Sequence, residues 1–337
     1  MSLRGKFISL IFATTALMFL VITTGAIEIS FANFLANSYD SFTEKVIFNI
    51  RLPRMLIACA AGGGLAVCGL CLQTWFKNQL ADPFLLGIHS GSSLGVAIYV
   101  LGLGLFFSDI EILGSSGAVI FGIIGALAIL LLMIIISTKF RGSIYIIIFG
   151  VVISFFITGL INLILSFGSA ESLKHFLLWS LGSFDRVSLS ESVIVLSLII
   201  LLVANLYRYS SFLNVCLLGD NYAKEAGVDL SFLRKIIIPS VGVISGMISV
   251  YCGPIIFVGL MAPHLTRMFF STSNHKVLIP GTFLLGSALC LLVIMFSNGH
   301  LFSFSVPINA LLGLLGTPFV LFLLIKTSIQ QKALGHV

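Results

Sequence analysis

Residues 51–95 read RLPRMLIACAAGGGLAVCGLCLQTWFKNQLADPFLLGIHSGSSLG, and this stretch decides the fold. Two arginines three positions apart precede an apolar segment of small residues, which ends at a polar turn carrying Lys77 and Asp82. A second apolar segment follows and opens with glycines. Small residues let helices approach each other closely inside a membrane. The stretch therefore predicts a closely packed membrane helix with charged residues at both ends.

The composition of the whole chain is that of a membrane protein. Of its 337 residues, 58% are hydrophobic and 9% are charged, whereas a soluble domain has about 25% charged residues. Apolar runs of about 20 residues cross a bilayer as helices, because only a helix satisfies its own backbone polar groups there. The predicted fold class is all-α, a polytopic membrane protein with short helices in its cytoplasmic loops. We interpret the net charge of +6 as an excess of basic residues in the loops on one side of the membrane, and we expect no nucleic-acid partner.

We expect one transmembrane domain over residues 1–337 with about ten spans. The first is taken as an uncleaved helix, because its apolar run exceeds the roughly 7–15 residues of a signal peptide. The eighth is short for a full crossing. The predicted spans are 7–27, 53–74, 84–107, 117–137, 143–167, 191–207, 233–251, 256–268, 277–297 and 307–326.

The distribution of basic residues predicts the orientation of the chain. Cytoplasmic loops carry an excess of Lys and Arg. With the N-terminus inside, most of the 18 basic residues fall on the inside. We therefore expect both termini to lie in the cytoplasm. The outside segments then hold only Lys45, Arg51, Arg54, Lys174 and Arg186.

The basic residues Arg51 and Arg54 run against this bias. At i and i+3 they share one face of a helix, and Pro53 suits its first turn. Arginines often extend to the membrane edge for purely topological reasons. An anchor for carboxylates of an external partner is the functional interpretation, and we favour it here.

The longest charged loop runs from Arg208 to Lys235, and its residues 213–235 read LNVCLLGDNYAKEAGVDLSFLRK. Asp220 stands where an N-cap is expected and Gly227 where a C-cap is expected. A second short helix is predicted from Val228 towards Arg234. Two small helices at the cytoplasmic face suit docking into a groove of another protein; an ordinary amphipathic connector is an equal alternative.

Several kinds of activity find little support in the sequence. No GxxxxGK[ST] phosphate loop is present, so ATP hydrolysis would need a separate subunit, and the chain itself is not expected to be an enzyme. No carboxylate lies well inside a span, which weighs against an ion-coupled secondary transporter. An intramembrane enzyme would need paired catalytic groups, and only the weak GSSG of residues 114–117 fits.

Cys68 and Cys71 form a CxxC within an apolar run and are interpreted as buried hydrophobic residues. No metal site or cofactor is expected.

Seven segments, in order and at matching spacing, resemble the FecCD-type permeases of ABC importers for iron–siderophores, haem and vitamin B12. The resemblance covers nearly the full length of the chain. Its segments are RLPR at 51–54, LQTWFKNQLADPFLLGIHSGSSLG at 72–95, LWSLGSF at 178–184, LLGDNYAKEAGVD at 217–229, GPIIFVGLMAPHLTR at 253–267, LIPGTFLLG at 278–286 and PINALLGLLGTPFVLFLL at 307–324.

The resemblance implies an assembly in a bacterial cytoplasmic (inner) membrane. Two permease subunits, expected to be two copies of this chain, form one pathway between two ATP-binding cassette subunits and one solute-binding protein. Arg51 and Arg54 would receive acidic residues of the binding protein. The coupling helix that seats in the ATPase would be formed by Gly219, Asp220, Ala223, Ala226 and Gly227. Polar candidates for the pathway and gate are Ser154, Thr158, Asn162 and Asn309.

Two departures from the family pattern stand out: the first concerns the rigidity of a turn, and the second concerns the substrate. The turn reads NQLADP where the family usually has NPLADP, so Gln79 replaces a proline. Vitamin B12 permeases carry a further external arginine near a position where this chain has Asn298. The expected substrate is therefore an iron chelate, ferric siderophore or haem, with cobalamin as the alternative.

Overall fold

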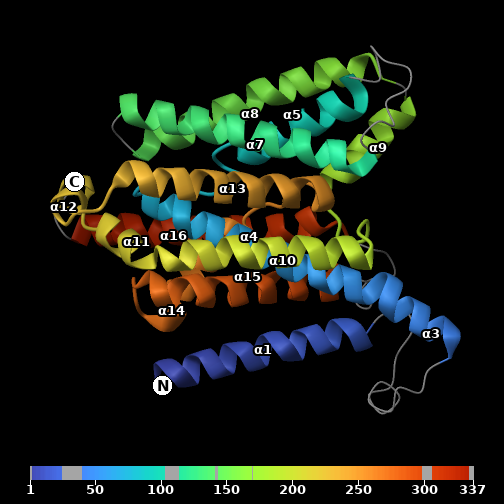
Figure 1. Cartoon of the computed structure of the whole chain (residues 1–337), viewed down its shortest axis with the longest axis horizontal. Coiled ribbons are helices and arrows are strands. Elements are labelled where there is room, and N and C mark those ends of the chain that lie inside the picture. Colours follow the sequence, from blue (N-terminus) through green and yellow to red (C-terminus); the bar gives the residue numbers. More distant parts are fainter. Residues whose placement is uncertain are drawn as a thin grey trace.

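The computed structural model of the protein describes residues 2–24, 40–102, 114–140, 143–168, 170–297 and 306–333. Within these ranges every regular element is helical, which confirms the all-α prediction. The long helices lie side by side along the longest axis of the molecule (Figure 1). Among the described residues, seven helices are long and apolar enough to cross a membrane.

The elements follow one another without a strand in the part of the chain that is described. Two of them, η1 and η2, are π-helical turns. In order they are α1 (Leu3–Thr23), α3 (Ser41–Val46), η1 (Ile47–Arg51), α4 (Leu52–Trp75), α5 (Ile88–Ala97), η2 (Ile98–Gly102), α7 (Gly114–Lys139), α8 (Ser143–Ser166), α9 (Ala170–Ser180), α10 (Leu189–Arg208), α11 (Ser210–Cys216), α12 (Asp220–Glu225), α13 (Leu230–Cys252), α14 (Val258–Phe270), α15 (His275–Ser297) and α16 (Ile308–Ala333).

Each of the ten predicted spans overlaps one of these helices, while the number of crossings stays a prediction. The eighth is short as expected, since α14 has 13 residues. The third begins later than predicted, because residues 83–87 form turns before α5. Residues 103–107 at its other end lie outside the described residues. The GSSG motif opens α7 rather than a loop.

The second span begins earlier than predicted. Helical structure runs without interruption from Ser41 through η1 into α4, a stretch of 35 residues. Asp40 caps its start, because its carboxylate accepts a hydrogen bond from the Thr43 amide at 3.2 Å. The π-helical turn lies directly before Pro53, whose ring nitrogen has no hydrogen to donate. The segment between the first two predicted spans is therefore helical from Ser41 onward, and residues 25–39 lie outside the described part.

Helix α4 is the buried centre of the bundle, as its small residues predicted. Almost every side chain from Ile57 to Thr74 is buried. A Cβ added at Gly62 would lie within 3.0 Å of the Gly286 carbonyl on α15, and one added at Gly69 would meet Gly259 on α14. These glycines let three helices approach backbone to backbone. The cysteines of α4, Cys68 and Cys71 included, are buried among them.

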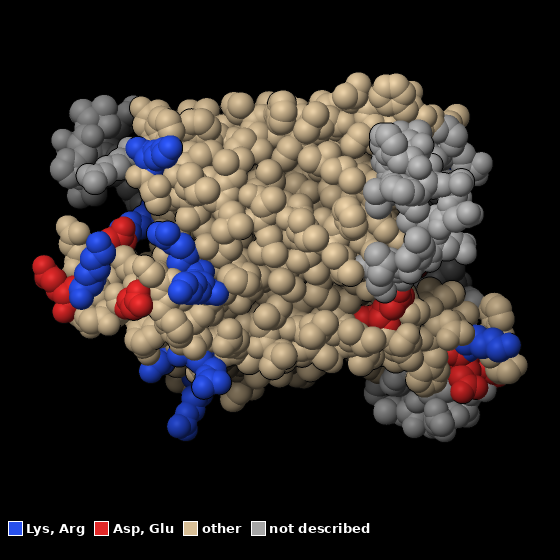
Figure 2. Space-filling model, turned by 45° about the horizontal axis from the view of Figure 1, so that its top comes forward, with Lys and Arg blue, Asp and Glu red and all other residues tan. Residues whose placement is uncertain are grey.

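The two ends of the bundle differ in their elements, and we name them by α9 and α12. The α9 end also holds α3; the α12 end holds α11, the first residues of α1 and the last described residues of α16 (Figure 1). Charged side chains gather at both ends and leave an uncharged band between them (Figure 2). Large apolar side chains are exposed along that band, among them Phe155, Leu201 and Leu314. A surface of this kind fits lipid or a second membrane subunit.

The loop 213–235 corrects one prediction. No second short helix follows Val228, because Leu230 begins α13, which continues to Cys252. Asp229 caps this long helix: its carboxylate accepts from the amides of Ser231 at 2.8 Å and Phe232 at 3.1 Å. A further short helix that the sequence analysis did not predict, α11, precedes α12.

Candidate functional site at the two ends of the bundle

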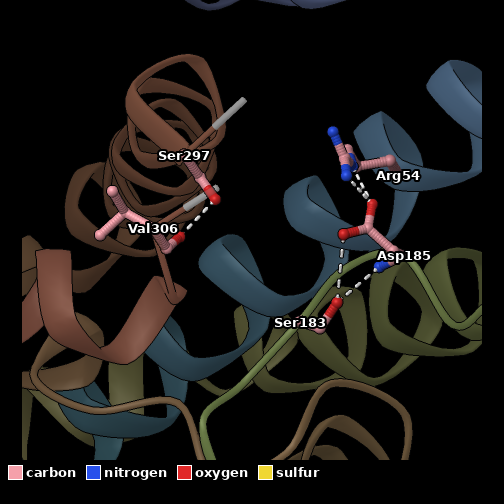
Figure 3. Close-up of polar contacts among 5 residues, drawn as sticks. All are labelled: Arg54, Ser183, Asp185, Ser297 and Val306. Atoms are coloured by element: carbon pink, nitrogen blue, oxygen red, sulfur yellow. Dashed lines mark hydrogen bonds and ion pairs between the residues drawn. The ribbon is translucent and has the colours of Figure 1, made fainter. Parts of the chain in front are cut away.

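Arg54 at the α9 end forms an ion pair within the chain. Its guanidinium bonds to the carboxylate of Asp185, in the loop between α9 and α10 (Figure 3). Ser183 holds Asp185 in place, since its hydroxyl donates to the carboxylate at 3.2 Å and accepts from the Asp185 amide at 3.1 Å. The side chains of Arg54 and Asp185 remain 23% and 47% exposed. The pair is therefore accessible from outside the bundle.

Arg51 has a different environment from Arg54. It is buried, with 7% of its surface exposed. Its Nη1 donates to the carbonyl of Ile22 at 2.6 Å, in the last turn of α1. A cation at the C-terminus of a helix satisfies a carbonyl that has no partner within the helix. The structure thus separates the two predicted docking arginines, and the docking role of both stays a prediction.

A small pocket of about 160 Å³ lies beside the Arg54 pair. Arg54, Asp185 and Pro307 line it, together with the ends of α15 and α16. The Ser297 hydroxyl donates to the Val306 carbonyl at 2.6 Å and closes the far side (Figure 3). Asn298 lies outside the described residues.

Helix α9 is held against the bundle by polar contacts. The indole of Trp179 donates to the Val250 carbonyl at 3.0 Å, and the Ser183 amide donates to the Cys252 carbonyl at 2.9 Å. Asn309, a predicted pathway residue, donates from Nδ2 to the carbonyls of Ser180 at 3.2 Å and Pro254 at 2.8 Å. Asn309 therefore joins the end of α9, the segment between α13 and α14, and the start of α16 at one point.

The other predicted pathway residues lie along α8. Ser154 is half-buried, and its hydroxyl donates to the Gly150 carbonyl at 2.8 Å. Thr158 and Asn162 are exposed on the same helix, next to Phe155. The side-chain hydrogen bonds of Asn309 go to Ser180 and Pro254, and not to these residues of α8. Their role in a pathway stays a prediction.

Helix α12 is a single turn and a half that projects from the α12 end. It ends in a Schellman motif: the Val228 amide donates to the Ala223 carbonyl at 2.9 Å, and the Gly227 amide donates to the Lys224 carbonyl at 3.0 Å. Gly227 has φ of +80°, so the C-terminal role predicted for it is confirmed. Ala223 is fully buried beneath the helix, whereas Ala226 is exposed.

Asp220 does not cap α12 as predicted. Gly219 occupies the N-cap position, and Asp220 is the first helical residue. The Asp220 carboxylate instead pairs with Lys77 Nζ at 2.8 Å. Lys77 follows the end of α4 and has φ of +49°. This pair connects the projecting helix directly to the central helix.

A hydrogen-bond network that the sequence analysis did not predict joins α11 to the core. The Asn214 side-chain oxygen accepts from the His275 amide at 2.7 Å and lies 2.8 Å from His275 Nδ1. On the other side of the ring, His275 Nε2 lies 2.8 Å from the Thr74 hydroxyl of α4. The sequence does show that Thr74, Asn214 and His275 are polar residues close to the ends of apolar segments. It gives no indication that these three residues, which are far apart in the chain, contact one another.

The architecture defines a class: an all-helical, multi-pass membrane protein with charged side chains at two opposite ends (Figure 2). Comparison with known proteins identifies the family. The FecCD transport family matches residues 13–326, and the chain belongs to this family.

Individual relatives agree with that assignment. The chain is 32% identical over 309 residues to the "Putative ABC transporter permease protein MJ0876" of Methanocaldococcus jannaschii, with 85% of each covered. It is 30% identical over 286 residues to the vitamin B12 import system permease protein BtuC of Salmonella typhimurium, again with 85% of each covered.

A solved structure has the same fold over nearly the whole chain. It is described as "An inward-facing conformation of a putative metal-chelate type ABC transporter", and it aligns with a TM-score of 0.81 at 29% identity. The match covers 96% of this chain and 99% of that chain. The protein is thus a permease of the ABC transporter type, a transport subunit.

Proposed function

We propose that the chain forms the membrane pathway of a binding-protein-dependent ABC importer for an iron chelate, either a ferric siderophore or haem. Membership of the FecCD transport family over residues 13–326 carries this proposal. The likeness to a metal-chelate type ABC transporter supports a chelated metal as the substrate class.

In this proposal the α12 end faces the cytoplasm and the α9 end faces outward. Both termini are cytoplasmic, in a bacterial inner membrane. The excess of basic residues on the predicted inside loops supports this orientation. The first residues of α1 and the last described residues of α16 lie at the α12 end, which agrees with an even number of crossings (Figure 1).

The α9 end would receive a solute-binding protein. Arg54 is the better placed of the two predicted arginines, because it is partly exposed while Arg51 is buried. Its guanidinium already pairs with Asp185. A carboxylate of the binding protein would therefore compete with Asp185 for Arg54, and displacement would release the loop that follows α9.

The α12 end would seat in an ATPase subunit. Exposed Asp220, Ala226 and Gly227 supply a small, projecting surface, with half-buried Gly219 beside them and Ala223 packed beneath. Two such subunits would act on two permease copies, which we expect to be identical. Movement of α12 would reach α4 through Lys77 and would reach α15 through α11 and His275. Coupling of this kind requires contacts that differ between the two states of the bundle.

The pathway would run between the two copies, and no covalent chemistry takes place in it. Thr158 and Asn162 on the exposed side of α8 are candidates to line it, with Ser154 behind them. Asn309 would act at the gate, because it holds α9 and α16 together.

Cobalamin is the second candidate substrate. The 30% identity to vitamin B12 import permeases favours it, whereas Asn298 at the position of their additional arginine weighs against it. Cobalamin is itself a metal chelate, so the same pathway chemistry serves both candidates.

Transport in proteoliposomes tests the proposal. The permease would be reconstituted with its ATPase and loaded binding protein, and uptake of radiolabelled ferric siderophore, haem and cobalamin would be compared. We expect ATP-dependent uptake of an iron chelate. If cobalamin is the only compound taken up, cobalamin replaces the iron chelate as the assigned substrate. Uptake driven by a proton or sodium gradient without ATP would instead favour an ion-coupled secondary transporter.

A further inference from the structure

A cavity of about 930 Å³ lies at the α12 end, beside the projecting helix. Its walls come from the ends of α4, α7 and α13, the start of α8 and the α11–α12 segment. Gly219 and Asp220, which the proposed function places on the ATPase-docking surface, form part of one wall, while the other walls come from the bundle itself.

Basic side chains dominate the charge of the lining. Lys77, Lys224 and Arg234 line the cavity, and Asp220 is the one acidic residue in its described lining. Asp220 already pairs with Lys77. Neither Lys224 nor Arg234 pairs with a carboxylate among the described residues. The cavity therefore has an uncompensated positive charge.

Arg234 is held towards the cavity. Its guanidinium carbon lies 5.7 Å from the centre of the Trp75 ring, within the range of cation–π attraction. Its Nε is buried and has no hydrogen-bond partner within the described part of the chain. A buried donor without an acceptor costs free energy, so an acceptor entering the cavity would relieve this cost. Asn221 and Tyr222 add neutral donors to the same lining.

The cavity lies at the level where membrane spans end. Trp75, Leu230 and Ile146 belong to the first or last turns of three apolar helices, and all three line it. Phe140 and Leu218, also in the lining, are 45% and 65% exposed. A basic pocket between helix ends, bordered by exposed apolar side chains, has the arrangement that receives lipid headgroups.

We propose that this cavity binds a phosphate-bearing anion through Lys224 and Arg234. The exposed apolar residues at its border favour the headgroup of an anionic phospholipid, which would enter from the bilayer with its acyl chains against Phe140 and Leu218. Free phosphate has the same recognition chemistry and is the other source. Bound there, the anion would connect α12 to the ends of α4 and α13.

Native mass spectrometry of the purified full-length permease tests this proposal. The protein would be extracted from nanodiscs of phosphatidylcholine with and without phosphatidylglycerol, and the retained lipids counted. We expect retained phosphatidylglycerol in the wild type and about tenfold less in the Lys224→Gln/Arg234→Gln variant, since each cation near an anionic surface contributes measurably to binding. Lys235→Gln/Lys276→Gln is the matched control: it removes the same charge from exposed residues outside the cavity lining, and retention should not change.

Titration calorimetry with inorganic phosphate distinguishes the two sources. Phosphate binding that disappears in the double variant, without retained lipid, assigns the site to free phosphate. Equal lipid retention in both double variants, together with no phosphate binding, overturns the proposal. If the Lys224→Gln/Arg234→Gln protein does not elute as a single species, two single variants replace it. Arg234→Lys keeps the positive charge, so lipid retention should stay within about twofold of the wild type. The exposed Lys224→Gln variant then measures the loss by itself.

Discussion

The two ends of the bundle each carry an ion pair, but the pairs differ in how they are supported. At the α9 end, Asp185 is held by Ser183, and the neighbouring loop is bonded to Cys252 and Asn309. At the α12 end, Lys77 and Asp220 are 44% and 62% exposed, and a Cβ added at Gly219 or Gly227 would meet nothing within 4 Å. The α9 end is thus part of the packed framework, whereas α12 projects from it. Substitutions at the α9 end should affect stability and docking together, and substitutions of the exposed residues of α12 should affect docking alone.

The largest effect is expected from a bulky residue on α12. Ala226→Trp should leave the fold intact, because Ala226 is exposed, but should block seating in the ATPase and reduce ATP-driven transport by about 100-fold or more, as expected for a central interface residue. Copurification of the ATPase measures the loss. Val193→Trp, on the exposed surface of α10, is the control. Full retention of the ATPase by Ala226→Trp would remove α12 from the proposed interface.

Exchanging the charges of the α9 pair separates docking from stability. Arg54→Glu places two carboxylates together, and should lower the melting temperature and abolish stimulation of ATPase activity by the binding protein. The double variant Arg54→Asp/Asp185→Arg restores an internal pair, so the melting temperature should recover. Stimulation should remain at least about tenfold reduced, because the docking cation has moved.

This exchange has a clear contrary outcome. If the double variant recovers both stability and stimulation, Arg54 acts only through Asp185 and is no docking residue. The corresponding exchange of Lys77 and Asp220 is the comparison at the other end, where an exposed pair should contribute less than about 1 kcal/mol.

Helix α4 connects the two pairs, and its packing can be weakened selectively. Gly69→Ala would force α4 away from α14, because the added Cβ meets the Gly259 backbone. Overpacking of this kind costs about 1–3 kcal/mol. Gly159→Ala on α8 is the matched control, since its Cβ would meet nothing within 4 Å. Thermal unfolding of the purified permease should show a lower melting temperature for the first variant only; equal behaviour of both would contradict the close packing of α4.

The last prediction concerns the pH dependence of Asp82, in the turn that carries Lys77. Burial raises the pKa of Asp82 to about 7 from its ordinary value of 3.8. The folded state therefore holds this proton more tightly than the unfolded state, and stability falls as pH rises from 3.8 to about 7. Asp82→Asn should remove that fall, because the amide oxygen can still accept from the Phe84 amide.

Melting temperatures between pH 5 and 8 measure this effect on Asp82. The advantage of Asp82→Asn over the wild type should grow with pH and level off near pH 7. Asp220→Asn, an exposed carboxylate at the same end, controls for the loss of one charge. Parallel curves for Asp82→Asn and the wild type would show that Asp82 does not titrate in this range.

Short-range features of the candidate site could be predicted from the sequence. Gly227 ends α12 because a left-handed residue is needed there, and a glycine after a short polar helix is a local signal. The first residue of α12 was misplaced by one position, since Gly219 and Asp220 both suit a helix start. The pairing of Asp185 with Arg54 could not be predicted, because nothing in the sequence links two residues that are 131 positions apart.

The sequence by itself determined the helical membrane fold, the approximate positions of the long helices and the closely packed central helix, because hydropathy, helix length and small residues act locally along the chain. Only the tertiary structure decided which charged groups are accessible. Arg51 and Arg54 look equivalent at i and i+3, yet one is buried against the end of α1 and the other lies at the surface beside Asp185. The partners of a side chain depend on which distant helices pack around it, and that arrangement follows from the shape of the whole bundle.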